Sequence, residues 1–99
     1  MGIVAATVTQ QQYIAYKADL ERDILAINQA KLSLSSSMSD LLNAGTDLDP
    51  DNPMVKQLEQ RKERLHLLEK KLDMQLEEKK VKLSMVEKNL QECQGMMKG

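Results

Sequence analysis

The chain has no tryptophan and no phenylalanine, and only two tyrosines and one cysteine among its 99 residues. Any core must therefore be built from leucine, isoleucine, valine and methionine, and the single cysteine cannot form an internal disulfide. Leu, Met, Lys, Gln, Glu and Ala, which are abundant here, lose little side-chain freedom in a helix. These features predict an all-α protein and give no sign of an oxidising compartment.

Long apolar runs and a strong net charge are also missing. No segment approaches the ~20 consecutive apolar residues of a membrane span, and the N-terminus lacks the basic region of a signal peptide. The formal net charge of -1 argues against nucleic acid or an anionic membrane as a partner. We therefore expect a protein made in the cytoplasm without a cleavable signal peptide or membrane insertion, whose export would require a dedicated secretion system.

The first half of the chain carries a seven-residue apolar repeat. The repeat is typical of one helical stripe and predicts a helix over residues 10–43. Residues 1–9 contain several β-branched side chains, and we expect this segment to be flexible or conditionally ordered. The stripe consists of Tyr13, Leu20, Ile27, Leu34 and Leu41, with Ile24 and Met38 on the adjacent helical position.

Both prolines lie within residues 45–53, which read GTDLDPDNP. Gly45 follows the last periodic leucine, where a residue with positive φ often ends a helix. Asn52 is placed to cap a second helix, and Pro53 suits its first position because the missing N–H would have no partner there. We predict a turn over residues 44–52. The glycine and the two prolines favour a chain that folds back on itself, and an extended exchanged dimer is the alternative. The predicted turn residues are Gly45, Pro50, Asp51, Asn52 and Pro53.

The second half predicts a helix over residues 53–94, followed by a frayed tail at 95–99. Its apolar stripe recurs at intervals near those of a coiled coil, with Lys79 as a polar interruption and a phase slip between Leu68 and Leu76. The fold prediction is therefore an antiparallel, coiled-coil-like two-helix hairpin in a single domain, within an oligomer or filament. This helix contributes to the seam Leu58, Leu65, Leu68, Leu72, Leu76, Leu83, Val86 and Leu90, and Cys93 continues the stripe as a packed thiol.

A second apolar stripe lies on the opposite side of the same predicted helix. It consists of Leu67, Met74, Val81 and Met85, the first three of which are spaced by seven residues. One interpretation is that these are scattered surface residues, which are common. The other is that a helix with two apolar stripes has two neighbours, so that this stripe contacts another copy or another protein.

The chemistry-bearing residues do not form a recognisable site. Asp47, Asp49 and Asp51 alternate like the start of a calcium loop, but the glycine and glutamate that such a loop requires are absent. His66 and Cys93 are too few for a zinc site. We therefore expect no catalytic residues, no metal and no cofactor, and predict that the protein is not an enzyme.

The turn Pro50-Asp51-Asn52-Pro53, followed by MVKQLEQ, resembles the needle subunits of type III secretion systems. That resemblance implies a hairpin that is exported unfolded and polymerises into a hollow helical filament. It also implies that residues 1–9 and the C-terminal segment contact other subunits. The stretch NPMVKQLEQRKERLHLLEKKL is similar to a group of short bacterial coiled-coil proteins, which implies no particular function.

Two hypotheses about function follow. The first is a structural protein that self-assembles through helical packing, as a filament or a secretion-needle-like subunit. The alternative is a cytosolic coiled-coil adaptor or secretion chaperone that binds another helical protein.

Overall fold

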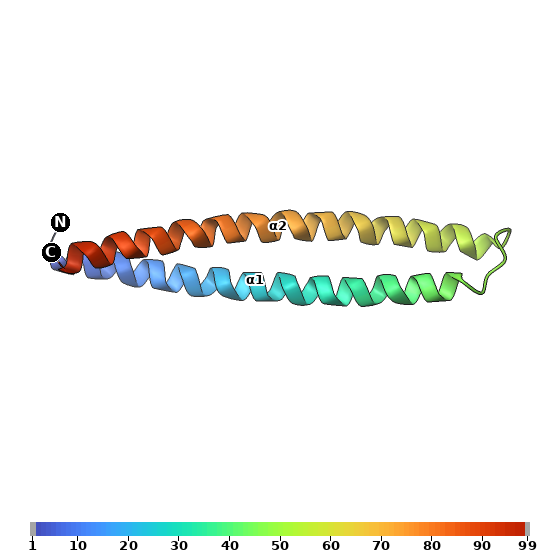
Figure 1. The fold of residues 1–99 in the computed structure, drawn as a ribbon, viewed down its shortest axis with the longest axis horizontal. Helices are drawn as coiled ribbons and strands as arrows, with labels where there is room; N and C mark the ends of the chain where they lie inside the picture. Colours follow the sequence, from blue (N-terminus) through green and yellow to red (C-terminus); the bar gives the residue numbers. More distant parts are fainter. Residues whose placement is uncertain (1, 99) are drawn as a thin grey trace. The chain divides into compact units, whose positions relative to one another are not determined.

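The computed structural model describes residues 2–98, which form two helices joined by a short loop (Figure 1). Helix α1 spans Ile3–Gly45 and helix α2 spans Pro53–Lys98. The described residues contain no strand. The predicted all-α helical hairpin is confirmed.

Helix α1 begins at Ile3, so the prediction of a flexible segment over residues 1–9 is wrong for the residues described. The hydroxyls of Thr7 and Thr9 each donate a 2.9 Å hydrogen bond to the carbonyl four residues earlier, on Ile3 and Ala5. Ala6 is buried at 5% exposure and lies seven residues before Tyr13, on the same stripe. Packing of this stripe therefore outweighs the weak helix propensity of the β-branched residues.

The end of α1 also differs from the prediction. The helix continues through Gly45, and no glycine among residues 2–98 has a positive φ. The Thr46 hydroxyl instead donates a 2.8 Å hydrogen bond to the Asn43 carbonyl. The Leu48 amide donates a 3.4 Å hydrogen bond to the Gly45 carbonyl. The last carbonyls of the helix thus find partners without a left-handed residue.

Pro50 lies in the turn between the helices, whereas Pro53 is the first residue of α2. The Asn52 amide donates a 2.9 Å hydrogen bond to the Asp49 carbonyl, which closes a four-residue turn with Pro50 at its second position. The fixed φ of proline suits that position. The Asp49 carboxylate also accepts a 3.2 Å hydrogen bond from the Asp51 amide. The Asp49 side chain therefore stabilises the turn.

Helix α2 begins at Pro53 as predicted, and Asn52 caps it. The Asn52 Oδ1 atom accepts a 2.9 Å hydrogen bond from the Met54 amide, which has no helical partner of its own. The helix then extends to Lys98, beyond the predicted end at Gln94, so the predicted fraying is not seen up to Lys98. Gly99 lies outside the described residues.

The chain divides into two compact units, each of which is described by itself. The first unit comprises Met1–Ala26 and Leu76–Gly99. Its core is a cluster of leucine and valine side chains from both helices, with Leu20 only 1% exposed. The cluster consists of Leu20, Val86 and Leu90, against which Tyr13 and Leu83 pack. Leu76 is also buried, and so is the Cys93 thiol, as the sequence predicts.

The second unit comprises Ile27–Gln75, including the turn. Leu34 is its buried seam residue, and most of the other predicted seam positions are half-buried. The exception is Leu68, which is 45% exposed. Leu68 begins the stretch in which the heptad phase slips. An assignment based on continuous spacing therefore puts Leu68 in the seam, although its side chain is exposed. The half-buried positions are Ile27, Met38, Leu41, Leu58, Leu65 and Leu72.

Candidate interaction surface

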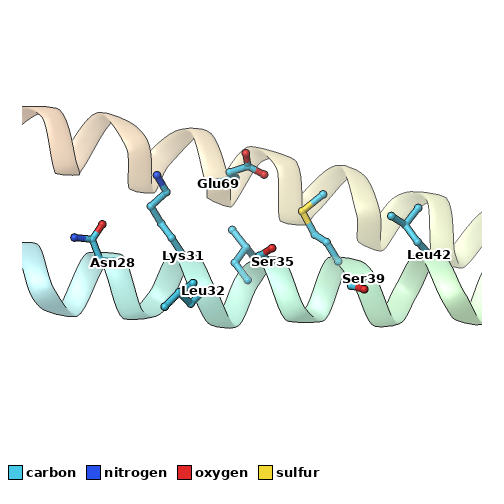
Figure 2. A pocket seen from close by; sticks show the side chains of 9 residues that line it. Asn28, Lys31, Leu32, Ser35, Ser39, Leu42 and Glu69 are labelled. Carbon is cyan, nitrogen blue, oxygen red and sulfur yellow. The ribbon is translucent and has the colours of Figure 1, made fainter.

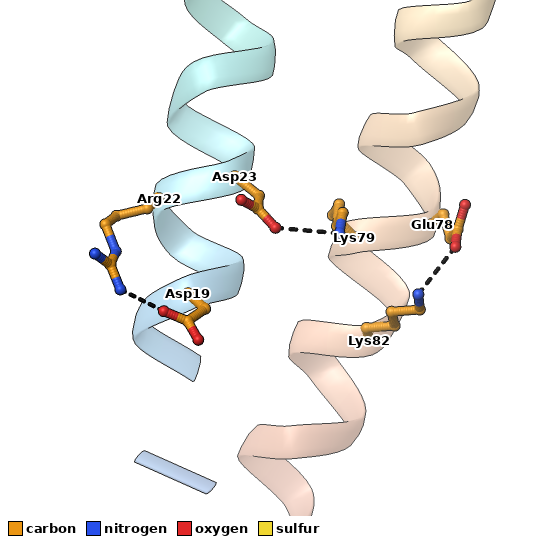
Figure 3. Close-up of polar contacts among 6 residues, drawn as sticks. All are labelled: Asp19, Arg22, Asp23, Glu78, Lys79 and Lys82. Atoms are coloured by element: carbon orange, nitrogen blue, oxygen red, sulfur yellow. Dashed lines mark hydrogen bonds and ion pairs between the residues drawn. The ribbon is translucent and has the colours of Figure 1, made fainter. Parts of the chain in front are cut away.

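Ion pairs between the helices flank the seam in each unit. In the first unit, Lys79 Nζ lies 3.1 Å from Asp23 Oδ2 (Figure 3), and Lys17 Nζ lies 3.8 Å from Glu87 Oε1. Lys79, which interrupts the apolar stripe in the sequence, therefore pairs with a carboxylate across the seam. These side chains are partly exposed, so each pair contributes at most about 1 kcal/mol to stability.

In the second unit, Lys31 Nζ lies 2.6 Å from Asp73 Oδ1. Lys31 comes 14 residues after Lys17 on α1, and Asp73 comes 14 residues before Glu87 on α2. Both units therefore pair their helices in the same antiparallel register. The ion pairs specify this register more than they stabilise the fold.

Further ion pairs lie within single helices. Arg22 contacts Asp19 on α1, and Lys82 donates a 2.9 Å hydrogen bond to Glu78 on α2 (Figure 3). That hydrogen bond, with the attraction between the opposite charges, lowers the pKa of Glu78 and raises the pKa of Lys82. Lys82 is partly exposed and Glu78 is exposed, so the pair has only a local effect on α2.

The stripe opposite the seam of α2 is exposed along its whole length. Met74 is 73% exposed and Leu67 is 61% exposed, both in the second unit. Met85 is 60% exposed and Val81 is 51% exposed, both in the first unit. We call these four residues the α2 outer stripe. Helix α1 buries the seam of α2 and leaves the outer stripe open.

Sequence reasoning missed the exposed apolar residues of α1. Ile14, Leu25 and Leu32 are all exposed, and Leu32 reaches 72%. Ile3, Ile14 and Leu25 are 11 residues apart, which is three helical turns and brings them to one side of the helix. A search for 11-residue spacing would have found this stripe, whereas the seven-residue repeat selected only the seam.

A groove of about 790 Å³ runs beside Leu32 in the second unit (Figure 2). The small side chains of Ser35 and Ser39 keep it open, and Glu69 of α2 contributes one carboxylate. Its lysine, Lys31, is already paired with Asp73. The groove therefore offers a contact surface rather than a set of reacting groups. It is lined by Asn28, Lys31, Leu32, Leu34, Ser35, Met38, Ser39, Leu42 and Glu69.

Three kinds of feature were sought among the described residues: a metal-binding cluster, an unpartnered buried polar atom and a membrane-spanning helix. This part of the chain holds no cluster of three or more His, Cys, Asp or Glu side chains that could bind a metal ion. It also holds no buried side-chain nitrogen or oxygen without a hydrogen-bond partner. Neither α1 nor α2, over the residues described, has a stretch apolar enough to cross a membrane.

Comparisons of the chain with protein-family models, with curated proteins and with solved structures gave no match. The α2 outer stripe is therefore the feature from which a function is inferred.

Proposed function

We propose that the protein is a non-enzymatic structural protein that self-assembles through the α2 outer stripe. The observation that carries this proposal is the exposure of Leu67, Met74, Val81 and Met85, each more than half exposed on one side of a single helix. Apolar surface gathered along one line marks a site of protein contact far more often than scattered apolar residues do. Burial of this surface between copies would supply a favourable free energy that the isolated chain forgoes.

The thin core of the hairpin supports the same proposal. The buried apolar side chains among the described residues are few, and only Leu20 is less than 2% exposed. A pair of helices buries one stripe from each, which leaves little core to offset the conformational entropy lost on folding. Oligomerisation is a common way for small helical proteins to add the missing apolar contacts. A filament or a secretion-needle-like assembly is one form that such packing takes.

Sedimentation velocity over about a hundredfold range of protein concentration tests the proposal, because self-association follows mass action. We expect the weight-average sedimentation coefficient to rise with concentration and the species to dissociate on dilution. A monomer at every concentration would contradict the proposal and favour an adaptor that buries the same stripe against a different protein.

A further inference from the structure

The charges that flank the α2 outer stripe occupy positions symmetric about Met74 and have opposite signs before and after it. Residues 70–78 read KKLDMQLEE, with two lysines four and three residues before Met74 and two glutamates three and four residues after it. Helix α2 runs unbroken from Pro53 to Lys98, so the helical repeat alone decides which of these side chains share a face. Lys70 and Glu77 lie on one flank of the stripe, and Lys71 and Glu78 lie on the other.

These four charged side chains are exposed. Over the part of the chain that the structure describes, Lys70, Lys71 and Glu77 take part in no ion pair, and Glu78 contacts Lys82 on its own helix. Lys70, Lys71 and Glu77 are thus available to a second chain, and Glu78 would share its carboxylate between Lys82 and the partner's lysine. Seam-flanking charges such as Asp73 and Lys79 are instead engaged with α1.

We propose that the α2 outer stripe binds the same stripe of a second copy in antiparallel orientation, with a two-fold axis at Met74. The proposal rests on the proposed self-assembly and specifies its first contact. A two-fold axis at Met74 brings each lysine beside a glutamate of the other copy on the same flank: Lys70 meets Glu77, and Lys71 meets Glu78. Each of the two contacts occurs twice, because the axis repeats it.

Three of the four apolar residues agree with this register, whereas Met85, eleven residues after Met74, has Glu63 at the mirrored position. Met74 meets Met74 at the axis, and Leu67, seven residues before it, meets Val81, seven residues after it. The complementary charges around Met74 favour a second copy over an unrelated helix as the occupant.

A parallel arrangement in register would place like charges together. Lys70 and Lys71 of one copy would face the same lysines of the other, and Glu77 and Glu78 would face glutamates. Repulsion between like charges at an interface disfavours that arrangement. The antiparallel contact uses the same surface on both chains and closes at two copies, so growth into a larger assembly requires another surface. The exposed residues of α1, including Leu25 and Leu32, provide one.

Charge reversal tests the pairing. At low ionic strength we expect the variants K70E/K71E and E77K/E78K each to raise the dissociation constant of the dimer about tenfold or more, because like charges then meet at all four contacts. A mixture of the two variants should associate again, because every acidic flank then meets a basic one. The measurement is sedimentation velocity of each variant and of the equimolar mixture, with circular dichroism to verify helix content.

The matched control for K70E/K71E is R61E/K80E, which makes the same change in net charge at two exposed positions of α2 away from the outer stripe. It should associate as the unmodified chain does. If both reversal variants associate normally while the unmodified chain still assembles, the pairing at Met74 is wrong and self-assembly stands. If the mixture of reversal variants stays monomeric, complementary pairing is wrong. A monomeric unmodified chain would instead overturn the proposed self-assembly, and this contact with it.

Disulfide trapping tests the orientation without altering any charge. In a Cys93→Ala background, a mixture of Leu67→Cys and Val81→Cys chains should form an intermolecular disulfide under mild oxidation. Neither variant alone should do so. In the antiparallel dimer the same position on the two copies lies on opposite sides of the axis, so two identical introduced thiols are about 20 Å apart, the length of 14 helical residues. Efficient cross-linking of Leu67→Cys with itself would indicate parallel packing and overturn the proposed orientation.

Discussion

Replacement of Met74 and Val81 by glutamate is expected to abolish self-association and to leave the helix content unchanged. In the free chain the two side chains are 73% and 51% exposed, so two carboxylates at these positions remain in water. In the assembled state both carboxylates would be buried against apolar side chains, and the carboxylates that M74E introduces on the two copies would meet at the two-fold axis. Desolvation of an unpaired charge costs several kcal/mol per ion, which exceeds what a short apolar stripe supplies.

Sedimentation velocity and far-ultraviolet circular dichroism, measured on the same samples, check this result. The control is Ile14→Glu with Leu25→Glu, which adds the same charge at exposed apolar positions of α1. We expect that control to retain the first step of association. If the M74E/V81E variant assembled like the unmodified chain, the assignment of the outer stripe as the assembly surface would be wrong.

The second large effect concerns folding itself. Leu20→Ala should lower the free energy of unfolding by about 2 to 5 kcal/mol, the range found for buried leucine-to-alanine changes. Leu20 is 1% exposed and packs with Val86 and Leu90, so truncation leaves a cavity where the two helices meet in the first unit. For a hairpin with so thin a core, a loss of this size removes most of the stability.

Urea unfolding followed by circular dichroism measures this effect. Protein concentrations should be low and equal across samples, because association would add apparent stability. Leu32→Ala is the matched control: this leucine is 72% exposed, and its truncation should change the free energy of unfolding by less than about 0.5 kcal/mol. Equal effects at Leu20 and Leu32 would mean that seam packing does not stabilise the hairpin.

The sequence predicted those parts of the structure that depend on helical periodicity or on proline chemistry. Tyr13 and Leu20 keep a seven-residue spacing, and Pro50 and Pro53 suit particular positions in a turn and at a helix start. These signals act locally, so they can be recognised in a single sequence. The spacing of Leu67, Met74 and Val81 likewise predicted a face away from the seam, and the structure leaves that face exposed.

The errors arose where tertiary packing competes with a local preference. Ala6 continues the seam toward the N-terminus, yet it is small and lies among β-branched residues whose propensity suggested a flexible segment. The conformation of Gly45 was also mispredicted, because hydrogen bonds from Thr46 and Leu48 satisfy the helix end without a positive φ. Leu68 lies at the phase slip, where spacing alone does not determine the facing side.

Methionine oxidation provides the most direct test of the claim that assembly buries the α2 outer stripe, because it requires no substitution. Met74 and Met85 lie on the stripe at 73% and 60% exposure, and Met54 lies off it at 57%. All three should therefore oxidise readily in dilute, dissociated protein. At concentrations that favour assembly, we expect oxidation of Met74 and Met85 to slow while that of Met54 is unchanged. Unaltered oxidation of Met74 and Met85 in fully assembled protein would show that a different surface holds the copies together.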